Sequence, residues 1–506
     1  MEFEFPVPST LLILVLPFLL FVYMLLRLRP RKRSSIPIPG PTKLPIIGNI
    51  HNIAGDSRPP HQIFKDLAAK HGPLLHLQLG EVPFIIASSV EVAKQLLKTH
   101  DLEFANRPPG YAATPITYNY TNICFAPYGD YWRRLRRIST LELFSARRVK
   151  SFRHVREEEN LKLAKWIASS SGSPMDLSEK VYLSSFDVVT RSSIGSSIDE
   201  RRKITEAVKQ VVQIGSGLSI ADLYPSIKFL PYVTGLMSRI DRTFRQLDTV
   251  LDRILDQHRA NKKDDDAMET DLVDVLLKYQ GEGVELPLTN DNIKAVVLDM
   301  FTAGGETSAT VVEWAMSEMT KNPTTLKRAQ EEVRKVFDGK GFVDEEKIHE
   351  LEYLKLVIKE TLRLHPPAPL LVPRYRQERF EMNGYEVPAK STVLVNAWAM
   401  GRDPEYWKEA LKFRPERFME SSSAVEFKGN DLEFIPFGAG RRMCPGMNFG
   451  TASVEFTLCI LLYHFDWEML AGVKNEDLDM AEDIGLTLKR KHHLYLIPTV
   501  RRPLAA

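Results

Sequence analysis

The 506-residue chain is poor in cysteine and nearly balanced in charge. Three cysteines, Cys124, Cys444 and Cys459, are too few for a disulfide framework, and an odd number fits a chain that mostly faces a reducing compartment. With 67 basic and 65 acidic residues the formal net charge is +2, which removes the electrostatic case for nucleic acid as the main partner. No segment repeats with a period of roughly 20 to 50 residues, so solenoids and propellers are not expected.

Charged side chains are absent from residues 7–26, which consist mostly of Leu, Ile, Val and Phe. A membrane-spanning helix needs about 20 such residues. Glu2 and Glu4 precede the stretch and five basic residues follow it within 27–33, so the positive-inside tendency predicts a retained anchor over 1–29, with the rest of the chain in the cytosol. A cleaved signal peptide is the alternative; the acidic flank and the missing small-residue cleavage site argue against it.

Prolines gather directly after the anchor, at Pro37, Pro39, Pro41 and Pro45. Because proline fixes φ and removes a donor, residues 30–45 are predicted to form a stiff basic and proline-rich hinge, although an ordinary loop with chance prolines remains an alternative. Residues 46–506 would then form one large globular domain. Within it, residues 261–266 are a charged run, which indicates a mobile loop rather than a domain boundary.

The globular part predicts a mainly helical fold with small β-sheets. Residues 74–79 and 84–87 indicate a β-hairpin, and most later segments have helical periodicity. The longest predicted helix begins near Thr289 and ends before Pro323, on the order of 45 Å. Gly304 and Gly305 lie in its middle, where each glycine costs about 1 kcal/mol relative to alanine. Close approach of a ligand and tight helix packing explain this pair equally well.

The strongest chemical signal is the glycine-rich loop FGAGRRMCPG at residues 437–446. Its amides can point at the Cys444 sulfur, and Arg441 and Arg442 would favour the thiolate, which is the form that binds metal. An inert buried thiol is the usual alternative for such a cysteine. One cysteine cannot make a structural zinc site, but it can be the axial ligand of a haem.

This loop, with its pattern Phe437-x-x-Gly440-x-Arg442-x-Cys444-x-Gly446, resembles the haem-loop signature of the cytochromes P-450. The likeness extends over essentially the whole chain. Matching segments occur in the family's order: Trp132-Arg-x-x-Arg136, the groove Ala303-Gly-Gly-Glu306-Thr307, Glu360-x-x-Arg363, and residues 413–418 with Arg417. Residues 365–369 and 401–404 are similar to those of the plant microsomal A-type group, the seventy-one clan.

Each of these matching segments, taken alone, has an ordinary structural explanation. Glu360 and Arg363 could be an exposed helix pair worth a few tenths of a kcal/mol. The arginines within 133–137 could be a solvated basic face, and Glu306 could be a surface acid beside the hydroxyl of Thr307. Their joint occurrence at compatible spacings favours the family.

The resemblance implies a single P-450 fold with the long central helix over a haem b. Cys444 would be the proximal ligand of the iron, and Thr307 with Glu306 the catalytic pair that delivers protons on the distal side. Other cofactor contacts implied are Trp132, Arg136, Arg374, Arg442, Phe437, Gly438 and Ala303. The first four would hold the haem propionates, while Glu360, Arg363 and Arg417 would form a buried structural triad.

The same resemblance implies a monooxygenase on the endoplasmic reticulum membrane, single-pass and facing the cytosol. It would use dioxygen and electrons from NADPH, delivered by a flavoprotein reductase that docks near the arginines of 133–137. An apolar plant metabolite is the expected substrate, with a terpenoid favoured over an alkaloid or phenolic. Two further activities stay open, a non-oxygenating rearrangement and non-catalytic binding of haem at a membrane.

The predicted pocket segments are dominated by apolar and small side chains, as an apolar small molecule would require, although helix-core packing would look the same. They are residues 115–126, 214–230, 298–307, 370–373 and 484–487. Two positions depart from the group's pattern, Gly305 in the groove and Tyr375 after Arg374, and both leave the shape of the distal pocket open.

Overall fold

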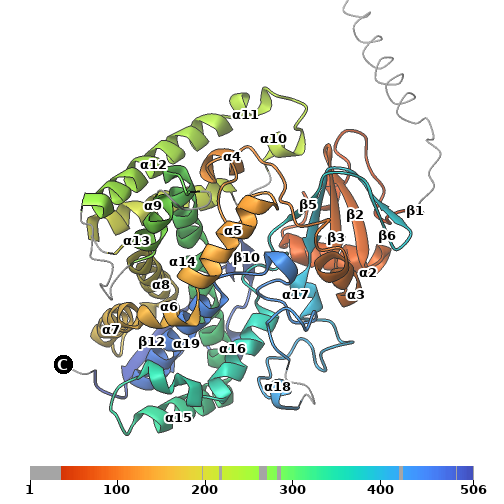
Figure 1. Cartoon of the computed structure of the whole chain (residues 1–506). Coiled ribbons are helices and arrows are strands. Elements are labelled where there is room, and N and C mark those ends of the chain that lie inside the picture. Colours follow the sequence, from red (N-terminus) through yellow and green to blue (C-terminus); the bar gives the residue numbers. More distant parts are fainter. Residues whose placement is uncertain are drawn as a thin grey trace, which may run out of the picture.

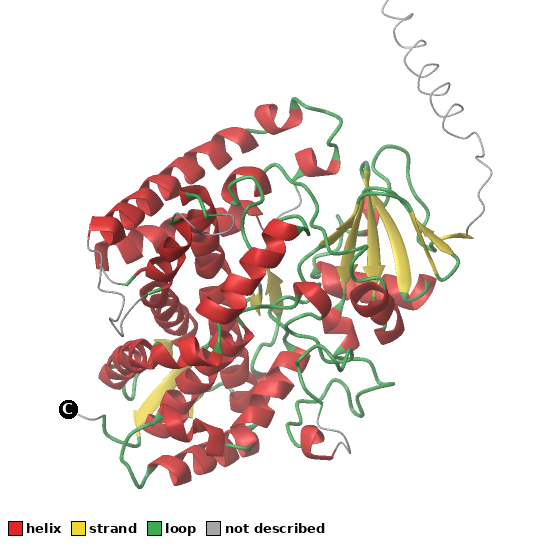
Figure 2. Ribbon diagram, viewed as in Figure 1, coloured by secondary structure: helices red, strands yellow, loops and turns green. Residues whose placement is uncertain are grey.

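The computed structural model describes residues 36–195, 198–215, 219–260, 271–281, 287–420, 425–485 and 487–504. The predicted anchor over 1–29, the first part of the predicted hinge and the charged run at 261–266 lie outside these residues. No helix in the described ranges combines the length and the apolar character needed to cross a membrane. Most of the helices form one large body, and the main β-sheet lies at its edge near residue 36 (Figures 1 and 2).

The fold is mainly helical with small sheets, as predicted. The helices are α2 (Pro60–His71), α3 (Val90–Lys94), α4 (Ala113–Ile116), α5 (Asp130–Ile138), α6 (Ala146–Ser151), α7 (Arg153–Ser169), α8 (Leu177–Ile194), α9 (Ile198–Gly215), α10 (Ile220–Leu223), α11 (Leu230–Val233), α12 (Leu236–Ala260), α13 (Leu272–Leu277), α14 (Asn290–Lys321), α15 (Pro323–Phe337), α16 (Tyr353–Leu364), α17 (Ala397–Met400), α18 (Arg417–Glu420) and α19 (Met447–His464).

The described strands form four small sheets with the orders β2-β3-β8-β5, β1-β7-β6, β4-β12-β9 and β10-β11. Their bounds are β1 (Ile36–Pro37), β2 (Leu74–Leu79), β3 (Val82–Ala87), β4 (Met175–Asp176), β5 (Arg374–Arg376), β6 (Phe380–Met382), β7 (Tyr385–Val387), β8 (Ser391–Val395), β9 (Phe465–Glu468), β10 (Glu482–Ile484), β11 (Leu488–Arg490) and β12 (Tyr495–Val500). The predicted hairpin is β2–β3, in which Leu79 pairs with Val82, and its second strand begins two residues earlier than expected.

The central helix α14 has the predicted ends. The Thr289 side chain caps it by accepting a hydrogen bond from the amide of Asn292, whose own side chain reaches back to the Thr289 backbone. Pro323 opens the next helix, where its missing N–H costs nothing. At 1.5 Å per residue, the 32 residues of α14 extend over about 48 Å.

The buried apolar side chains of α14 belong to two separate parts of the core. Those from Ile293 to Phe301 pack with α5, α8, α9, α12 and α13. Those from Ala309 to Met319 pack with α7, α15, α16 and α19. Residues 302–308 contribute to neither cluster, and Ala303 is exposed although it lies at the middle of the helix. The interrupted packing at this point leaves room for a functional site.

Close packing against α8 accounts for the two central glycines. A Cβ atom on Gly304 would lie 3.0 Å from Cγ2 of Val189, and one on Gly305 would lie 2.6 Å from Cδ2 of Phe186. The Ser185 hydroxyl also donates to the Gly305 carbonyl at 2.9 Å. Of the two explanations the sequence left open, the structure therefore favours helix packing.

Candidate active site

The cysteine loop holds a conformation that only glycine permits at one position. Gly440 has φ +71°, and a Cβ atom there would lie 2.3 Å from the Leu97 carbonyl oxygen and 2.8 Å from Cγ of Asp101. The Cys444 amide donates to the Phe437 carbonyl at 2.9 Å, which closes the loop before α19 begins. The loop therefore sets the direction of the Cys444 side chain through its backbone.

Cys444 differs in exposure from the cysteine of the following helix. Its side chain is exposed, whereas Cys459 is buried. The surrounding protein is nonetheless dense enough that burial raises the pKa of the Cys444 thiol, while the Gly446 amide and the charge of Arg136 lower it. The cation acting on this sulfur is thus Arg136 on α5, rather than the loop arginines that the sequence suggested.

Arg136 is half-buried, and in the described ranges of 36–504 no hydrogen bond or ion pair of its guanidinium is found. Burial lowers its pKa, and the nearby Cys444 sulfur raises it. A partly buried guanidinium without an anionic partner suits a carboxylate ligand. The residues present therefore fit a haem: Cys444 can bind its iron, and Arg136 can hold a propionate.

Arg442 and Trp132 stack on each other, with the guanidinium 4.4 Å above the ring. The guanidinium donates to the carbonyl oxygens of Ala105 at 2.7 Å and Ala126 at 2.5 Å. Trp132 Nε1 donates to the Ile123 carbonyl at 3.1 Å. Burial lowers the pKa of Arg442 to about 9. The structure brings both residues to the loop, and their contact with propionates stays a prediction.

Arg374, at the start of β5, is tied to the cysteine loop through a buried acid. It donates to the Asp101 carboxylate at 2.5 Å and to the Ala439 carbonyl at 2.9 Å. Asp101 also accepts from the Arg441 amide at 2.8 Å. Sequence analysis missed Asp101, since no motif pairs an acid at 101 with a loop more than 300 residues later. Contact of Arg374 with a propionate stays a prediction.

The predicted catalytic pair lies at the break in the core. The Thr307 hydroxyl donates to the Ala303 carbonyl one turn earlier, at 2.5 Å. The Glu306 carboxylate accepts from the Thr487 hydroxyl at 2.8 Å, and Thr487 lies 3.4 Å from the Thr310 hydroxyl. Thr487 belongs to a predicted pocket segment, but its contact with Glu306 was not anticipated.

Cys444 and α14 belong to the same part of the molecule. The helix that follows the loop, α19, packs on α14, and a Cβ atom on Gly450 would lie 3.7 Å from the Ser308 hydroxyl. Phe437 packs against the larger core cluster, and Gly438 has φ +73°. The thiol and the residues around Thr307 are therefore held by two helices in direct contact.

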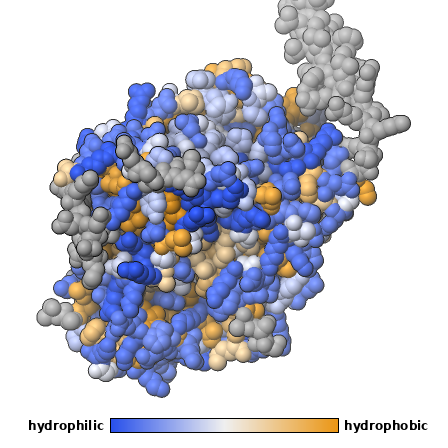
Figure 3. Space-filling model, viewed as in Figure 1, coloured by the Kyte–Doolittle hydropathy of each residue, from blue (hydrophilic) through white to orange (hydrophobic). Residues whose placement is uncertain are grey.

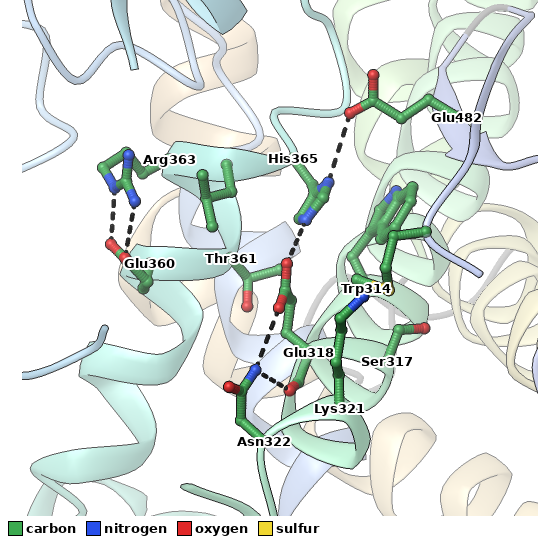
Figure 4. Close-up of polar contacts among 12 residues, drawn as sticks. Trp314, Ser317, Glu318, Lys321, Asn322, Glu360, Thr361, Arg363, His365 and Glu482 are labelled. Carbon is green, nitrogen blue, oxygen red and sulfur yellow. Dashed lines mark hydrogen bonds and ion pairs between the residues drawn. The ribbon is translucent and has the colours of Figure 1, made fainter. Parts of the chain in front are cut away.

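The three residues of the predicted triad meet in the interior. Arg363 donates to both carboxylate oxygens of Glu360, at 2.7 and 2.8 Å, and Arg417 donates to one of them at 2.9 Å. Arg363 also donates to the carbonyls of Gly401 and Ala410. Figure 4 shows the Glu360–Arg363 pair on α16. These bonds fasten α16 to the long segment that leads to the cysteine loop.

A second buried charged cluster lies beyond α16 and was not anticipated (Figure 4). His365 lies 2.8 Å from the Glu318 carboxylate and 3.6 Å from that of Glu482, and its ring stacks on Trp314 at 3.9 Å. Burial alone would raise the pKa of Glu482, but hydrogen bonds from His365 and His61 lower it well below its usual value. The only sequence signal was a histidine directly after a helix.

The exposed thiol on a glycine-turned loop, the long helix with its interrupted core and the unpaired guanidinium together define a haem-thiolate oxidoreductase. The chain belongs to the cytochrome P-450 family, whose model matches residues 38–497. Within that family it is a monooxygenase of the plant seventy-one clan.

Two relatives and one solved structure are similar to this chain over most of its length. The chain is 48% identical to salviol synthase of Salvia pomifera over 465 residues, covering 92% of each protein. It is 50% identical to desmethyl-deoxy-podophyllotoxin synthase of Sinopodophyllum hexandrum, covering 91% of each. A zebrafish cytochrome P-450 structure with progesterone superposes with a TM-score of 0.74 at 24% identity, covering 87% of this chain and 99% of that one, and shows the shared fold.

Proposed function

We propose that this monooxygenase hydroxylates an apolar plant metabolite, with a terpenoid skeleton as the favoured substrate. The observation that carries the proposal is the similarity to salviol synthase over nine-tenths of both chains.

A phenolic substrate is the second candidate. The relative named for desmethyl-deoxy-podophyllotoxin is just as similar to the chain, and it carries this alternative.

When bound, the haem supplies the redox chemistry that activates dioxygen. The chain's residues do the rest: Cys444 binds the iron as thiolate, and Arg136 balances the charge of a propionate. Thr307 holds a proton at Oγ1, and Glu306 can take one up at the carboxylate that now faces Thr487.

Electrons come from a redox partner, and we place its docking surface on the exposed side of α5. Arg133 and Arg137 are exposed there, and Arg133 pairs with Asp130. The charge reversal Arg137→Glu should slow association with a flavoprotein reductase and weaken its salt dependence. The matched control is Lys335→Glu on α15. Equal association rates for the two variants would contradict this docking surface.

We further propose that the chain sits on the endoplasmic reticulum membrane through residues 1–29, with its body in the cytosol. Support comes from exposed apolar side chains on one edge: Ile46 (69% exposed) and Phe229 (63%) with Tyr232 (70%) before and within α11. The Tyr224 hydroxyl donates to the Ile46 carbonyl at 3.4 Å, so the two segments adjoin. Figure 3 shows orange atoms at the top, where Figure 1 places α11. Such a patch suits a lipid surface.

The decisive experiment is co-expression with a reductase and NADPH against parallel panels of terpenoid, phenolic and alkaloid precursors, with products read by mass spectrometry. A hydroxylated terpenoid supports the proposal, and a product from only another panel replaces it. A product without added oxygen would identify the rearrangement. A thiolate-type carbon monoxide difference spectrum without turnover of any panel would favour the non-catalytic haem binder.

A further inference from the structure

Asp299 is a partly buried acid on α14 that no motif singled out. It precedes Ala303 by four residues and Thr307 by eight, so all three lie on the same face of the helix. The part of α14 before it packs among apolar side chains of α5, α12 and α13. A carboxylate at such a place is costly unless donors satisfy it.

Residues 122–124, in the loop before α5, supply those donors. The Asn122 side-chain amide donates to Oδ1 at 2.6 Å, and the backbone amides of Ile123 and Cys124 donate to Oδ2 at 2.7 and 3.1 Å. Burial raises the pKa of Asp299 to about 6, against these donors, so the group is still mostly ionised at neutral pH. The charge of Arg107 also lowers this pKa, although the described residues include no direct ion pair of Asp299.

On their other side, residues 122–124 contact the cysteine loop. The Ile123 carbonyl accepts from Trp132 and Arg442, at 3.1 and 3.4 Å. The Cys124 carbonyl accepts at 2.9 Å from Arg107, whose guanidinium donates at 2.7 and 2.8 Å to the carbonyls of residues 372 and 373. Residues 122–124 thus connect α14 to α5, to the loop and to the segment before β5.

We propose that Asp299 is a positioning residue for the oxidation: its carboxylate clamps residues 122–124 onto α14 and thereby sets the width of the pocket beside Thr307. Three of the predicted pocket segments, 115–126, 298–307 and 370–373, are held together through this one carboxylate and Arg107. The inference rests on the haem-thiolate class and not on any substrate, so it stands or falls separately from the terpenoid proposal.

Two nitrogen ligands of haem iron that differ in bulk, imidazole and 4-phenylimidazole, are suitable probes of pocket width. Full-length holoenzyme would be titrated with each and the two dissociation constants compared by absorption spectroscopy. Asp299→Ala removes the acceptor of three hydrogen bonds, so the affinity ratio should move on the order of fivefold toward the bulkier ligand. Asp299→Asn keeps one acceptor oxygen and should fall in between.

The matched control is Asp291→Asn, which removes an exposed acid from the first turn of the same helix and should leave the ratio unchanged. Hydrogen exchange adds a second readout, because the amides of Ile123 and Cys124 should exchange faster in the Asp299 variants. Should Asp299→Ala fail to take up haem, Asn122→Ala removes one donor and tests the same bond. An unchanged ratio, or a shift toward the smaller ligand, with wild-type exchange at 122–126 would overturn the proposal.

Discussion

Around Cys444, some features of the site are fixed by neighbouring residues in the sequence and others by residues far away in it. The direction of the Cys444 side chain is set by its own loop, whose conformation requires a glycine at position 440. The charge that favours its thiolate comes from Arg136, some 300 residues earlier. Loop geometry can be inferred from a glycine pattern, because it depends on neighbouring residues. The pairing of Arg374 with Asp101 spans 273 positions and could not be inferred that way.

Thr307 allows a test at this scale. Thr307→Ala removes the hydroxyl that now bonds the Ala303 carbonyl, so folding should change by less than about 1 kcal/mol. Proton delivery should suffer much more, and NADPH consumption should become uncoupled from product. The measurement is the ratio of product formed to NADPH oxidised, which we expect to fall by about tenfold or more.

Thr457→Ala is the matched control for Thr307→Ala, since its hydroxyl makes the same backward bond on α19, to the Ser453 carbonyl at 2.9 Å. Unaltered coupling in Thr307→Ala would favour the rearrangement over oxygen insertion.

Among the elements, the ends of α14 were well predicted. Caps, prolines and helical periodicity act over a few residues, so Thr289 and Pro323 marked the ends of α14 correctly. What the central glycines were for could not be predicted, because the answer lies in the side chains of α8. The buried charged cluster around Glu482 could not be predicted either, because its residues come from α2, α14, β10 and the end of α16, which are far apart in the sequence.

Glu360 gives the strongest prediction for an element. Glu360→Gln would leave Arg363 and Arg417 buried without their anion, and breaking such a pair costs about 3–5 kcal/mol. We expect a large loss of holoprotein and a lower thermal midpoint. The control Glu331→Gln breaks an exposed pair with Lys327 on α15 and should cost less than about 0.5 kcal/mol. Similar thermal midpoints for Glu360→Gln and Glu331→Gln would contradict a structural role for the triad.

His258 joins the end of α12 to the start of α13. Its Nδ1 lies 2.7 Å from the Ile254 carbonyl and its Nε2 2.8 Å from the Asp271 carboxylate, so both nitrogens face acceptors. Burial alone would lower the pKa of His258, but the hydrogen bond to Asp271 outweighs it and raises the pKa. Because the folded pKa exceeds the unfolded value near 6.5, this stabilisation is complete below about pH 6.5 and is lost as pH rises through the folded pKa.

The stability difference between wild type and His258→Ala should therefore be larger at about pH 6 than at about pH 8, measured by urea unfolding of the holoprotein. His154→Ala, at an exposed histidine whose ring hydrogen-bonds the Ser151 carbonyl, is the control and should show the same small effect at both pH values. A pH-independent difference for His258 would contradict the charged pair.

For the whole molecule, sequence motifs predicted the class and the mainly helical fold. They did so because the family's loop and helix patterns are local and occur in order along the chain. The clamp at Asp299 and the division of the core around residues 302–308 depend on contacts between distant segments, which no pattern in one sequence reports. The predicted anchor lies outside the described residues and stays a prediction.

The proposed membrane face can be tested on the full chain. Lipid vesicles should slow hydrogen exchange in residues 229–234, because burial of exposed apolar side chains in the interface orders that segment. Replacing Phe229 and Val233 with Ser should abolish this protection. The pair Phe342→Ser and Leu411→Ser, which removes exposed apolar side chains elsewhere, should not. Equal protection in both double variants would place the lipid contact on another surface.

The contact between Gly305 and Phe186 has a consequence for how such an enzyme acquires new specificities. A side chain cannot enter at position 305 unless the phenyl ring on α8 moves or shrinks, since 2.6 Å separates the would-be methyl from Cδ2. Libraries that randomise position 305 alone will therefore return mostly inactive variants. Varying positions 186 and 305 together allows pairs of side chains that changing either position alone does not. A smaller residue at position 186 should be introduced first, because it leaves space for a side chain at position 305.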